Sequence, residues 1–378
     1  MTWMIGHTFE PLLSTDQPAN RPMTVLPRIE CREFGQLPDG RLVHEYTLHQ
    51  GGLSLSAITF GGIVTRLLVP DRQGMRANVV LGFDRLEDYV ERNPHFGVIA
   101  GRYANRIAQG RFTLDGQEHQ LALSDGENCL HGGIRGFGAR LWQAEPAAGG
   151  TTALVLKYTS EAGEEGFPGR LQVTVRYTLG ADASWRIDYE ATTDAPTVVN
   201  LTHHDYFNLS GGGSVMQHRL QLAASRYTEV GPGLIPTGIA AVEGTPFDFR
   251  DPTVIDSRIR QDHPQLGFGR GYDHNWLLDR LGEDPLQPAA RLEDPASGRV
   301  MEVLTTEPAI QFYSGNFLDG SLIGSGGQRY RQGDGLCLET QHSPDSPNRA
   351  QAADWPSTVL RPGQVYRSST VHRFSVAG

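Results

Sequence analysis

Cysteine is scarce in this chain of 378 residues, with only Cys31, Cys129 and Cys337. They are far apart, odd in number and without CxxC spacing, which argues against both a disulfide framework and a zinc site. No apolar run reaches the roughly 18 residues that a membrane span needs. The N-terminus shows no basic segment followed by an apolar one. We therefore expect a cytoplasmic protein with no membrane association.

Positive charge is also in short supply. The 33 Lys and Arg residues stand against 43 Asp and Glu, giving a formal net charge of −10. No stripe of Lys and Arg occurs anywhere, so the electrostatic footprint of a nucleic-acid binder is missing. We expect no nucleic-acid partner.

Helical periodicity is rare, and turn residues are abundant. The 45 Gly and 23 Pro exceed average usage and suit many short strands joined by turns. One helix is predicted over Asp84–Arg92, with Asp84 as its cap. Strands are predicted for runs rich in Val, Ile, Thr and Tyr: Arg41–Gln50, Leu53–Phe60, Ile63–Val69, Thr151–Ser160, Arg170–Leu179, Ser184–Thr193, Thr197–Thr202, His218–Ala224, Val300–Thr305, Ala309–Ser314, Leu336–Gln341 and Val365–Phe374. The fold class indicated is all-β, a large antiparallel sandwich with few short helices.

The domain organisation predicted is a single large domain after a loose leader. Residues 1–27 carry four prolines among polar residues and show no strand or helix period, so we expect a loosely ordered N-terminal extension in which Met23 is a candidate true start. Residues 28–378 then form one domain, because all-β sandwiches often exceed the average domain length.

One carboxylate stands in a run that is otherwise apolar. Within residues 336–341, Glu339 shares one face of the predicted strand with Cys337 and Gln341, while the leucines face the other way. Glutamate is almost never fully buried without a partner, so this position indicates a cleft. In the companion strand, Gln311 has the same parity, and its amide can reach the same cleft.

Other polar segments are consistent with ligand binding, although each has a plainer structural explanation. Asn105 and Arg106 offer amide and guanidinium donors, or a surface ion pair. His131 precedes paired glycines that let backbone approach a ligand, although a lone His is more often structural. Asp273 accepts bonds from a diol or forms an Asx turn. Trp142, Phe207 and Tyr313 are candidates for aromatic platforms that stack on a sugar ring, although a large aromatic residue is more often part of the core.

Two histidines, His203 and His204, are adjacent in the sequence, and their roles have to be distinguished. Strand parity places His204 on one face and His203 with Asp205 on the other, so the two imidazoles do not share one role. An alternative takes His203 and Asp205 as two ligands of a non-haem iron, with a distal ligand such as His274. Only this weak spacing supports the iron site.

Taken together and in order, these segments resemble the aldose 1-epimerase family over about residues 41–374. No single segment is diagnostic, but nine occur in register: Asp71–Gly74, Gly82–Asp84, Asn93-Pro94, Gly101–Ile107, Leu130–Gly133 with Arg135–Phe137, Thr202–Leu209, Gly271–Asn275, Gln311–Asn316 and Leu336–Asn348. The resemblance implies a β-supersandwich of the galactose-mutarotase type. It also implies interconversion of the α and β anomers of a free aldohexose such as glucose or galactose.

Position by position, the resemblance implies that Glu339 is the general base and His204 the general acid. It implies that the substrate-binding residues are Asn105, Arg106, His131, Asp273 and Gln311. The reaction needs one proton removed from the C1 hydroxyl and one delivered to the ring oxygen, so we expect no metal and no cofactor. The expected partner is a small monosaccharide, and the expected assembly is a monomer or homodimer.

The pair works with Glu339 ionised and His204 protonated, and we expect hydrogen bonds and the nearby Asp273 to favour those forms. Two departures from the family pattern stand beside the site. His203 occupies a position where many members have Asn, and His95 one where an aromatic is common, which can change the mouth of the site.

Three other functions remain open. A hexose-6-phosphate epimerase would need an Arg or Lys cluster, whereas only Arg102, Arg106 and Arg135 are present. A non-catalytic sugar-binding module would not need an acid–base pair. A glycosidase would use Asp273 and Glu339 as its two carboxylates, which leaves the matched histidine unexplained.

Overall fold

The structure, a computed structural model, describes residues 27–280, 282–349 and 352–377. Residues 1–26 lie outside the described part, so the predictions of a loose N-terminal extension and of a start at Met23 are not addressed by it. The first strand, β1, begins at Arg28 and runs to Gln36, earlier than the first strand predicted from the sequence.

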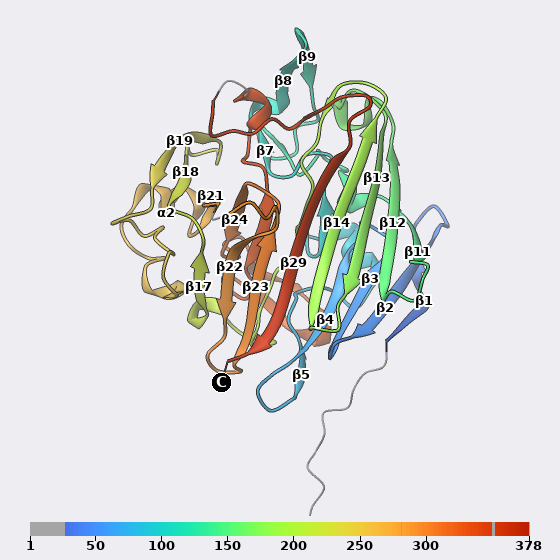
Figure 1. The fold of residues 1–378 in the computed structure, drawn as a ribbon, viewed down its shortest axis with the longest axis vertical. Coiled ribbons are helices and arrows are strands. Elements are labelled where there is room, and N and C mark those ends of the chain that lie inside the picture. Colours follow the sequence, from blue (N-terminus) through green and yellow to red (C-terminus); the bar gives the residue numbers. More distant parts are fainter. Residues whose placement is uncertain (1–26, 281, 350–351, 378) are drawn as a thin grey trace, which may run out of the picture.

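The largest sheet has nine strands and forms a broad layer in Figure 1, with every neighbouring pair antiparallel. Its longer strands alternate buried and more exposed residues, as expected for a sheet with one face on a core. In spatial order the strands are β11 (Gln143–Pro146), β12 (Ala153–Ser160), β13 (Leu171–Leu179), β14 (Ser184–Thr193), β29 (Tyr366–Val376), β23 (Arg299–Thr305), β22 (Gln287–Glu293), β17 (Arg219–Leu222) and β20 (Thr253–Val254).

A five-stranded antiparallel meander packs against this layer. Strand β2 contacts β12 and β13 across the interface, and β3 is buried along its whole length because it is covered on both faces. The meander consists of β1, β2 (Leu42–Gln50), β3 (Leu53–Ile58), β4 (Val64–Pro70) and β5 (Arg76–Asn78).

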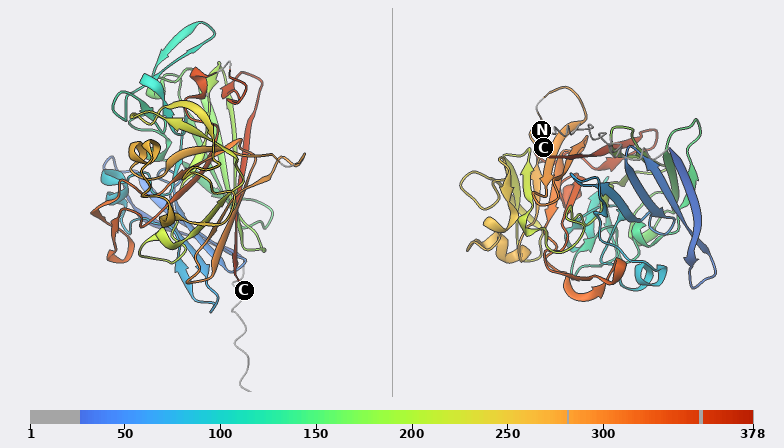
Figure 2. Two further views of the ribbon diagram at one scale, coloured as in Figure 1. Left: turned by 90° about the vertical axis from the view of Figure 1, so that its left-hand side faces the viewer. Right: turned by 90° about the horizontal axis from the view of Figure 1, so that it is seen from below.

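A second five-stranded sheet carries much of the candidate site. Its order is β19 (Pro236–Ala241), β18 (Arg226–Val230), β21 (Asp273–Leu277), β24 (Ala309–Tyr313) and β27 (Cys337–Gln341). The remaining strands pair in twos: β6 (Val98–Ala100) with β16 (Thr202–His204), β7 (Arg106–Ile107) with β10 (Cys129–Leu130), β8 (Arg111–Leu114) with β9 (Gln117–Gln120), β15 (Thr197–Val198) with β28 (Val359–Leu360), and β25 (Asp319–Ile323) with β26 (Arg329–Arg331). The hairpin β8–β9 projects from the end of the molecule opposite the C-terminus (Figures 1 and 2).

Two α-helices occur among the described residues, α1 (Leu86–Arg92) and α2 (Pro264–Gly269). The predicted helix is confirmed, but its predicted cap is wrong. Arg85 is the capping residue and makes no side-chain cap bond, whereas the Asp84 carboxylate accepts a hydrogen bond from the N–H of Gly326 at 2.9 Å. A distant loop thus competes with the helix end for this carboxylate.

One contiguous core joins the large sheet to both five-stranded sheets, and the all-β supersandwich prediction is confirmed. Most predicted strands occur within two residues of their expected ends. The run Thr197–Thr202 is wrong as one strand, because the N–H groups of Val199 and Asn200 bond to Thr358 and Arg102 and interrupt it between β15 and β16.

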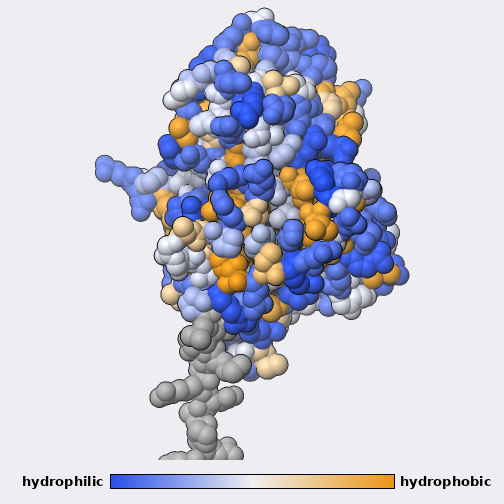
Figure 3. Space-filling model, turned by 90° about the vertical axis from the view of Figure 1, so that its right-hand side faces the viewer, coloured by the Kyte–Doolittle hydropathy of each residue, from blue (hydrophilic) through white to orange (hydrophobic). Residues whose placement is uncertain are grey.

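Apolar surface is not gathered into a belt on the face that Figure 3 shows, where hydrophobic residues lie in small groups among hydrophilic ones. Within the described ranges, no helix is both long enough and apolar enough to cross a membrane.

Candidate active site

Glu339 lies in the middle of β27 and is only 2% exposed. The neighbouring Leu336 and Leu338 belong to the main core, and Gln311 of β24 lies directly across from Glu339 in the sheet. The predicted parity of this strand is therefore confirmed. The carboxyl atom Oε2 has no hydrogen-bond partner among the described residues. Buried polar atoms are almost always paired, so this acceptor marks a place for a donor from a ligand.

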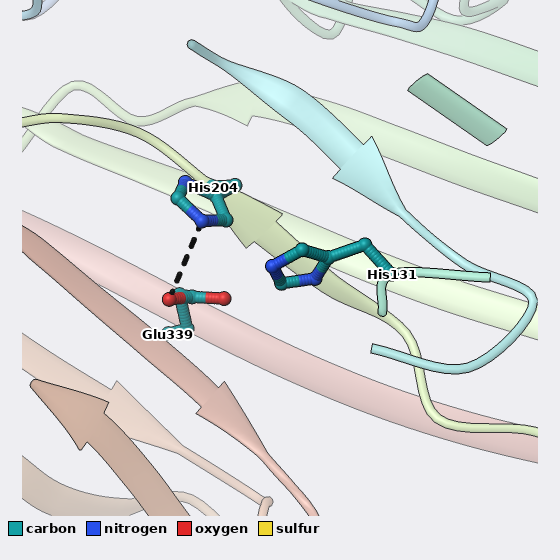
Figure 4. Close-up of side chains that lie close together, drawn as sticks. All are labelled: His131, His204 and Glu339. Carbon is teal, nitrogen blue, oxygen red and sulfur yellow. Dashed lines mark ion pairs between the residues drawn. The ribbon is translucent and has the colours of Figure 1, made fainter. Parts of the chain in front are cut away.

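His204, at the end of β16, faces this carboxyl. Its Nε2 lies 3.7 Å from Oε1 of Glu339, as Figure 4 shows. Its Nδ1 lies 3.5 Å from Sγ of Cys337, and its ring stacks on Tyr206 with centroids 5.2 Å apart. Because the ring is fixed by these contacts, Nε2 points at the carboxyl without closing a short hydrogen bond to it.

His131 follows β10 and approaches the pair from the other side (Figure 4). Its Nδ1 accepts a hydrogen bond from the backbone N–H of Asn105 at 3.3 Å, which assigns the ring proton to Nε2, the nitrogen directed at the pair. Gly132 next to it has φ +87, and a Cβ there would lie 1.9 Å from the carbonyl oxygen of Gly101. Glycine is therefore required here because the backbone of Gly101 packs against it. The sequence had suggested that a ligand would approach at this point.

Arg106 and Asn105 are held beside this ring. Arg106 donates from Nε to Asp125 Oδ2 at 2.7 Å, and its side chain is 9% exposed. The side-chain oxygen of Asn105 accepts from the N–H of Arg106 at 2.8 Å, which leaves the Asn105 amide NH₂ as a free donor group. Asp125 thus orients the guanidinium, a role that no local motif signalled.

Asp273 and Gln311 complete the cluster from β21 and β24. Gln311 donates from Nε2 to Asp273 Oδ1 at 2.7 Å, and its own Oε1 has no partner among the described residues. The chain of contacts therefore links all seven residues that the sequence predicted, from five separate strands, the bend before β7 and the turn after β10. Their proximity is a structural finding, and their roles remain predictions.

Burial dominates the titration of the acid–base pair. It raises the pKa of Glu339 well above 4.5, and the negative Asp273 raises it further, against an opposing effect of Arg106. Burial lowers the pKa of His204 well below 6.5, and His95 adds to this shift. Both directions oppose the expected ionised carboxylate and imidazolium, because Oε2 lacks the hydrogen bonds that would favour charge.

Three side chains of the cluster also meet the proximity requirement for a metal. Candidate ligand atoms of His131, His204 and Glu339 all lie within 4.8 Å of one another. The hydrogen bond from Asn105 opposes this use, because it leaves the inward Nε2 of His131 as a donor with no lone pair for a cation. The geometry fits a hydroxylated ligand better than an ion.

The proposed iron ligands do not converge. His203 Nδ1 lies 2.5 Å from Asp205 Oδ2, and its Nε2 lies 2.9 Å from the hydroxyl of Tyr177, on the opposite face of β16 from the site. His274 instead contacts Gln265 through Nε2 at 3.1 Å. The parity prediction for the two adjacent histidines is confirmed, and the iron site is wrong.

Other candidates are structural. Trp142 and Phe207 are buried in the core, so they provide no sugar platform, whereas Tyr313 packs edge-on against Tyr206 beside the site. Arg102 is 1% exposed and donates to the carbonyl groups of Pro168 and Gly169. It cannot hold a phosphate in that position.

His95 is the principal residue whose place in the cluster the sequence did not establish. Its ring centroid lies 4.8 Å from that of His131 and 5.6 Å from that of His204. It lines a cavity of about 200 Å³, to which His131 is the one contributor among the seven site residues. A larger hollow of about 550 Å³ lies elsewhere and includes Arg250 and Arg291 but none of the seven site residues.

Comparisons with known proteins show which proteins this chain resembles in sequence and fold. The sequence model of the family described as aldose 1-epimerase matches residues 44–373. A galactose mutarotase of Rattus norvegicus is 44% identical over 91% of this chain and 98% of its own length. An aldose 1-epimerase of Escherichia coli K12 is 39% identical over 89% of this chain and 96% of its own. The crystal structure of a galactose 1-epimerase from Lactobacillus acidophilus superposes with a TM-score of 0.82 at 26% identity, covering 93% of this chain and all of that one.

Proposed function

The chain belongs to the aldose 1-epimerase family and is an isomerase that interconverts aldose anomers, and we propose that Glu339 and His204 perform this reaction on free aldohexoses. The observation that supports these roles is the pair itself. A carboxyl with an unpartnered Oε2 faces an imidazole 3.7 Å from its Oε1, deep in a polar cluster.

In the proposed reaction, the Glu339 carboxylate takes the proton of the C1 hydroxyl while His204 delivers a proton to the ring oxygen. The bond from C1 to the ring oxygen breaks, and C1 becomes the carbonyl of the open aldehyde. After rotation by about half a turn about the C1–C2 bond, the ring closes on the other carbonyl face and both protons return. No electrons are gained or lost by the sugar, so proton transfer is sufficient and no cofactor is needed.

The pair holds one proton throughout this cycle. Burial favours that proton on Glu339, whereas the reaction needs it on His204. A sugar hydroxyl that donates to Oε2 would favour the carboxylate, because hydrogen bonds to the charged form lower a carboxyl pKa. We propose that substrate binding moves this proton across the 3.7 Å between the two groups.

The other five residues are proposed to bind the sugar. His131 offers its Nε2–H to a ring or hydroxyl oxygen, and Arg106 and Asn105 offer further donors from the same side. Asp273 accepts from a diol, fixed in place by its bond from Gln311. Several hydrogen bonds to one rigid ring restrict its rotation and bring C1 to the base.

The alternative functions fit less well. A hexose-6-phosphate substrate needs cations at its phosphate, but Arg102 is committed to backbone carbonyls and Arg106 to Asp125. A binding module would not require the buried acid–base pair. A glycosidase would leave His204, directed at the carboxyl, without a role.

Polarimetry of freshly dissolved α-galactose, α-glucose and α-glucose 6-phosphate tests the function and its sugar class. We expect acceleration of the two free sugars and little for the phosphate. Glu339→Gln should lose about 10²- to 10⁴-fold in kcat, the usual contribution of a general base, with the fold intact by circular dichroism. Near-wild-type activity of this variant would sink the base assignment without affecting the family.

Three coarser features accompany this proposal. We propose that residues 28–378 form one catalytic domain, supported by the contiguous core, and that the enzyme acts as a monomer or homodimer. We also propose a cytoplasmic location, which suits the free thiols of Cys31, Cys129 and Cys337. Ultracentrifugation of the purified chain and fractionation of the native host test these statements.

A further inference from the structure

We propose that His95 is a further sugar-binding residue that hydrogen-bonds the C6 hydroxyl of the hexose and so favours hexoses that carry it. The proposal rests on the role of His204 as the acid at the ring oxygen. It assigns a binding role that neither the catalytic pair nor the five predicted binding residues supply.

The ring of His95 is held in the site and is free to bond. It packs against His131 and His204, with tilts of 56° and 36° between the ring planes. Among the residues that the structure describes, none hydrogen-bonds to either of its nitrogens, and the residue is half-buried and lines a cavity together with His131. Burial lowers its pKa to about 4, so at neutral pH the ring can both donate to and accept from a hydroxyl.

The loop that carries His95 is built to hold it there. His95 has φ +71, a left-handed conformation that is uncommon for a residue with a side chain. Asn93 brackets the turn by accepting from the N–H of Phe96 at 2.7 Å and donating to its carbonyl at 3.2 Å. The hydroxyl of Tyr206 donates to the carbonyl of Pro94 at 3.0 Å. Strained backbone that surrounding contacts enforce is typical of functional sites.

The same loop is tied directly to the acid. The N–H of Gly97 donates to the backbone carbonyl of His204 at 2.9 Å. A Cβ at Gly97 would lie 2.2 Å from the carbonyl oxygen of Val64, so the loop packs against β4 without room to shift. His95 and His204 therefore keep a fixed relation, and a sugar positioned by one ring is positioned for the other.

The structure of the pyranose ring indicates which sugar group lies next to His95. The ring oxygen has two carbon neighbours, C1 and C5. Glu339 takes the C1 side in the proposed reaction, and His204 faces the ring oxygen. His95 contacts His204 and His131 but is not part of the close group that these two rings form with Glu339, so it is placed on the C5 side. The substituent on C5 is the hydroxymethyl group, whose hydroxyl on C6 is the polar atom within reach of that edge.

The experiment compares D-galactose with 6-deoxy-D-galactose, which differs only at that hydroxyl, by polarimetry of wild type and variants. Wild type should show a KM for the deoxy sugar roughly 3- to 10-fold higher, as one neutral hydrogen bond supplies. His95→Phe keeps an aromatic ring without nitrogens. It should raise KM for galactose by the same factor, leave KM for the deoxy sugar unchanged and hold kcat within about twofold.

His95→Gln retains a donor and an acceptor and should restore part of the discrimination. His119→Phe is the matched control, because that ring stacks on Phe112 in the projecting hairpin and should change neither sugar. Equal losses for both sugars, or no loss in His95→Phe, would overturn the proposal while leaving the roles of Glu339 and His204 intact. A wild type that does not distinguish the sugars overturns it without any variant, so the test does not depend on how well a variant folds.

Discussion

Two histidine–glutamate pairs lie in buried parts of this molecule, and they differ in how far they are closed. His342 Nδ1 lies 2.7 Å from Glu307 Oε2, and the other oxygen of Glu307 accepts from the hydroxyl of Tyr366 at 3.3 Å. In the site, His204 and Glu339 stay 3.7 Å apart, and one carboxyl oxygen has no partner among the described residues. The first pair is satisfied within the protein, whereas the second still has a bond to make.

The pKa shifts of the two histidines run in opposite directions because only one of them has a close, charged partner. Burial lowers the pKa of His342, but the charge and hydrogen bond of Glu307 outweigh burial and raise it overall. The pKa of His204 falls because burial acts there without a close, charged partner. A His–carboxylate pair therefore signals function when its geometry leaves bonding capacity unused, and not merely when it is buried.

The largest expected contrast is in catalytic rate. His204→Gln should lower kcat about 10²- to 10⁴-fold, because a general acid contributes about that much. His342→Gln should leave kcat within about threefold, since that pair does not face the site residues. Polarimetry at saturating galactose measures both. If His342→Gln were the more damaging change to kcat, the division into a functional and a structural pair would be wrong.

Stability should show the reverse ranking. Glu307→Ala removes the partner of His342 and should lower the free energy of unfolding by about 3–5 kcal/mol, as for other broken buried pairs. Glu339→Gln should cause no loss, because it removes a carboxyl whose pKa is raised by burial.

The sign for Glu339 follows from linkage. Its raised folded-state pKa contributes stability that is present below 4.5 and lost as pH rises through the folded value. The gain of Glu339→Gln over wild type should therefore increase with pH. The raised pKa of His342 contributes stability that is fully present below pH 6.5 and is lost as the pH rises through the folded-state pKa. Urea unfolding of wild type, Glu339→Gln and His342→Gln at several pH values checks both trends. If the unfolding free energies of all three proteins changed in parallel with pH, both trends would be contradicted.

A third buried pair, His203 with Asp205, lies next to the proposed acid His204 in the sequence. The hydroxyl of Tyr177 donates to the carbonyl of Gly62 at 2.7 Å, so its oxygen accepts from His203, which also faces Asp205. His203→Leu should cost about 1–3 kcal/mol in unfolding free energy by leaving Asp205 unpaired, with kcat reduced far less than in His204→Gln.

The double variant His203→Asn with Asp205→Ser is the matched control. It removes both members of the pair and should recover part of the lost stability, because no buried carboxylate is then left alone. Chemical denaturation of the single and double variants measures this. No recovery in the double variant would show that the two residues act independently.

The smallest expected effect is the response of activity to pH. The active site holds one proton between the lowered pKa of His204 and the raised pKa of Glu339. Because burial moves both pKa values away from their ordinary ranges, kcat/KM should show no steep change centred at the ordinary pKa of a histidine. A steep change in rate centred near 6.5 would show that His204 titrates normally.

Sequence patterns predicted the strands and faces well where the period was clear. The face of β27 that carries Glu339 and the opposed faces of His203 and His204 follow from the two-residue repeat of a strand. The long strands β13 and β14 were also predicted, because their alternation is regular.

Other elements depended on distant partners. Asp84 was predicted as a helix cap, but Gly326 takes its carboxylate. The run from 197 to 202 was predicted as one strand, but bonds to Thr358 and Arg102 divide it. None of these three partners could be identified from the local sequence, because all of them lie far away along the chain.

By itself the sequence determined the class of fold, the residue types available for acid–base chemistry and the strand faces on which they lie. These follow from local periodicity and composition. Only the tertiary structure decided the protonation and partners of those residues. The 3.7 Å gap between Glu339 and His204, the bond that fixes the His131 proton and the entry of His95 into the cluster all arise from segments distant in the chain. Burial and hydrogen bonding set a pKa, and both are properties of the folded molecule.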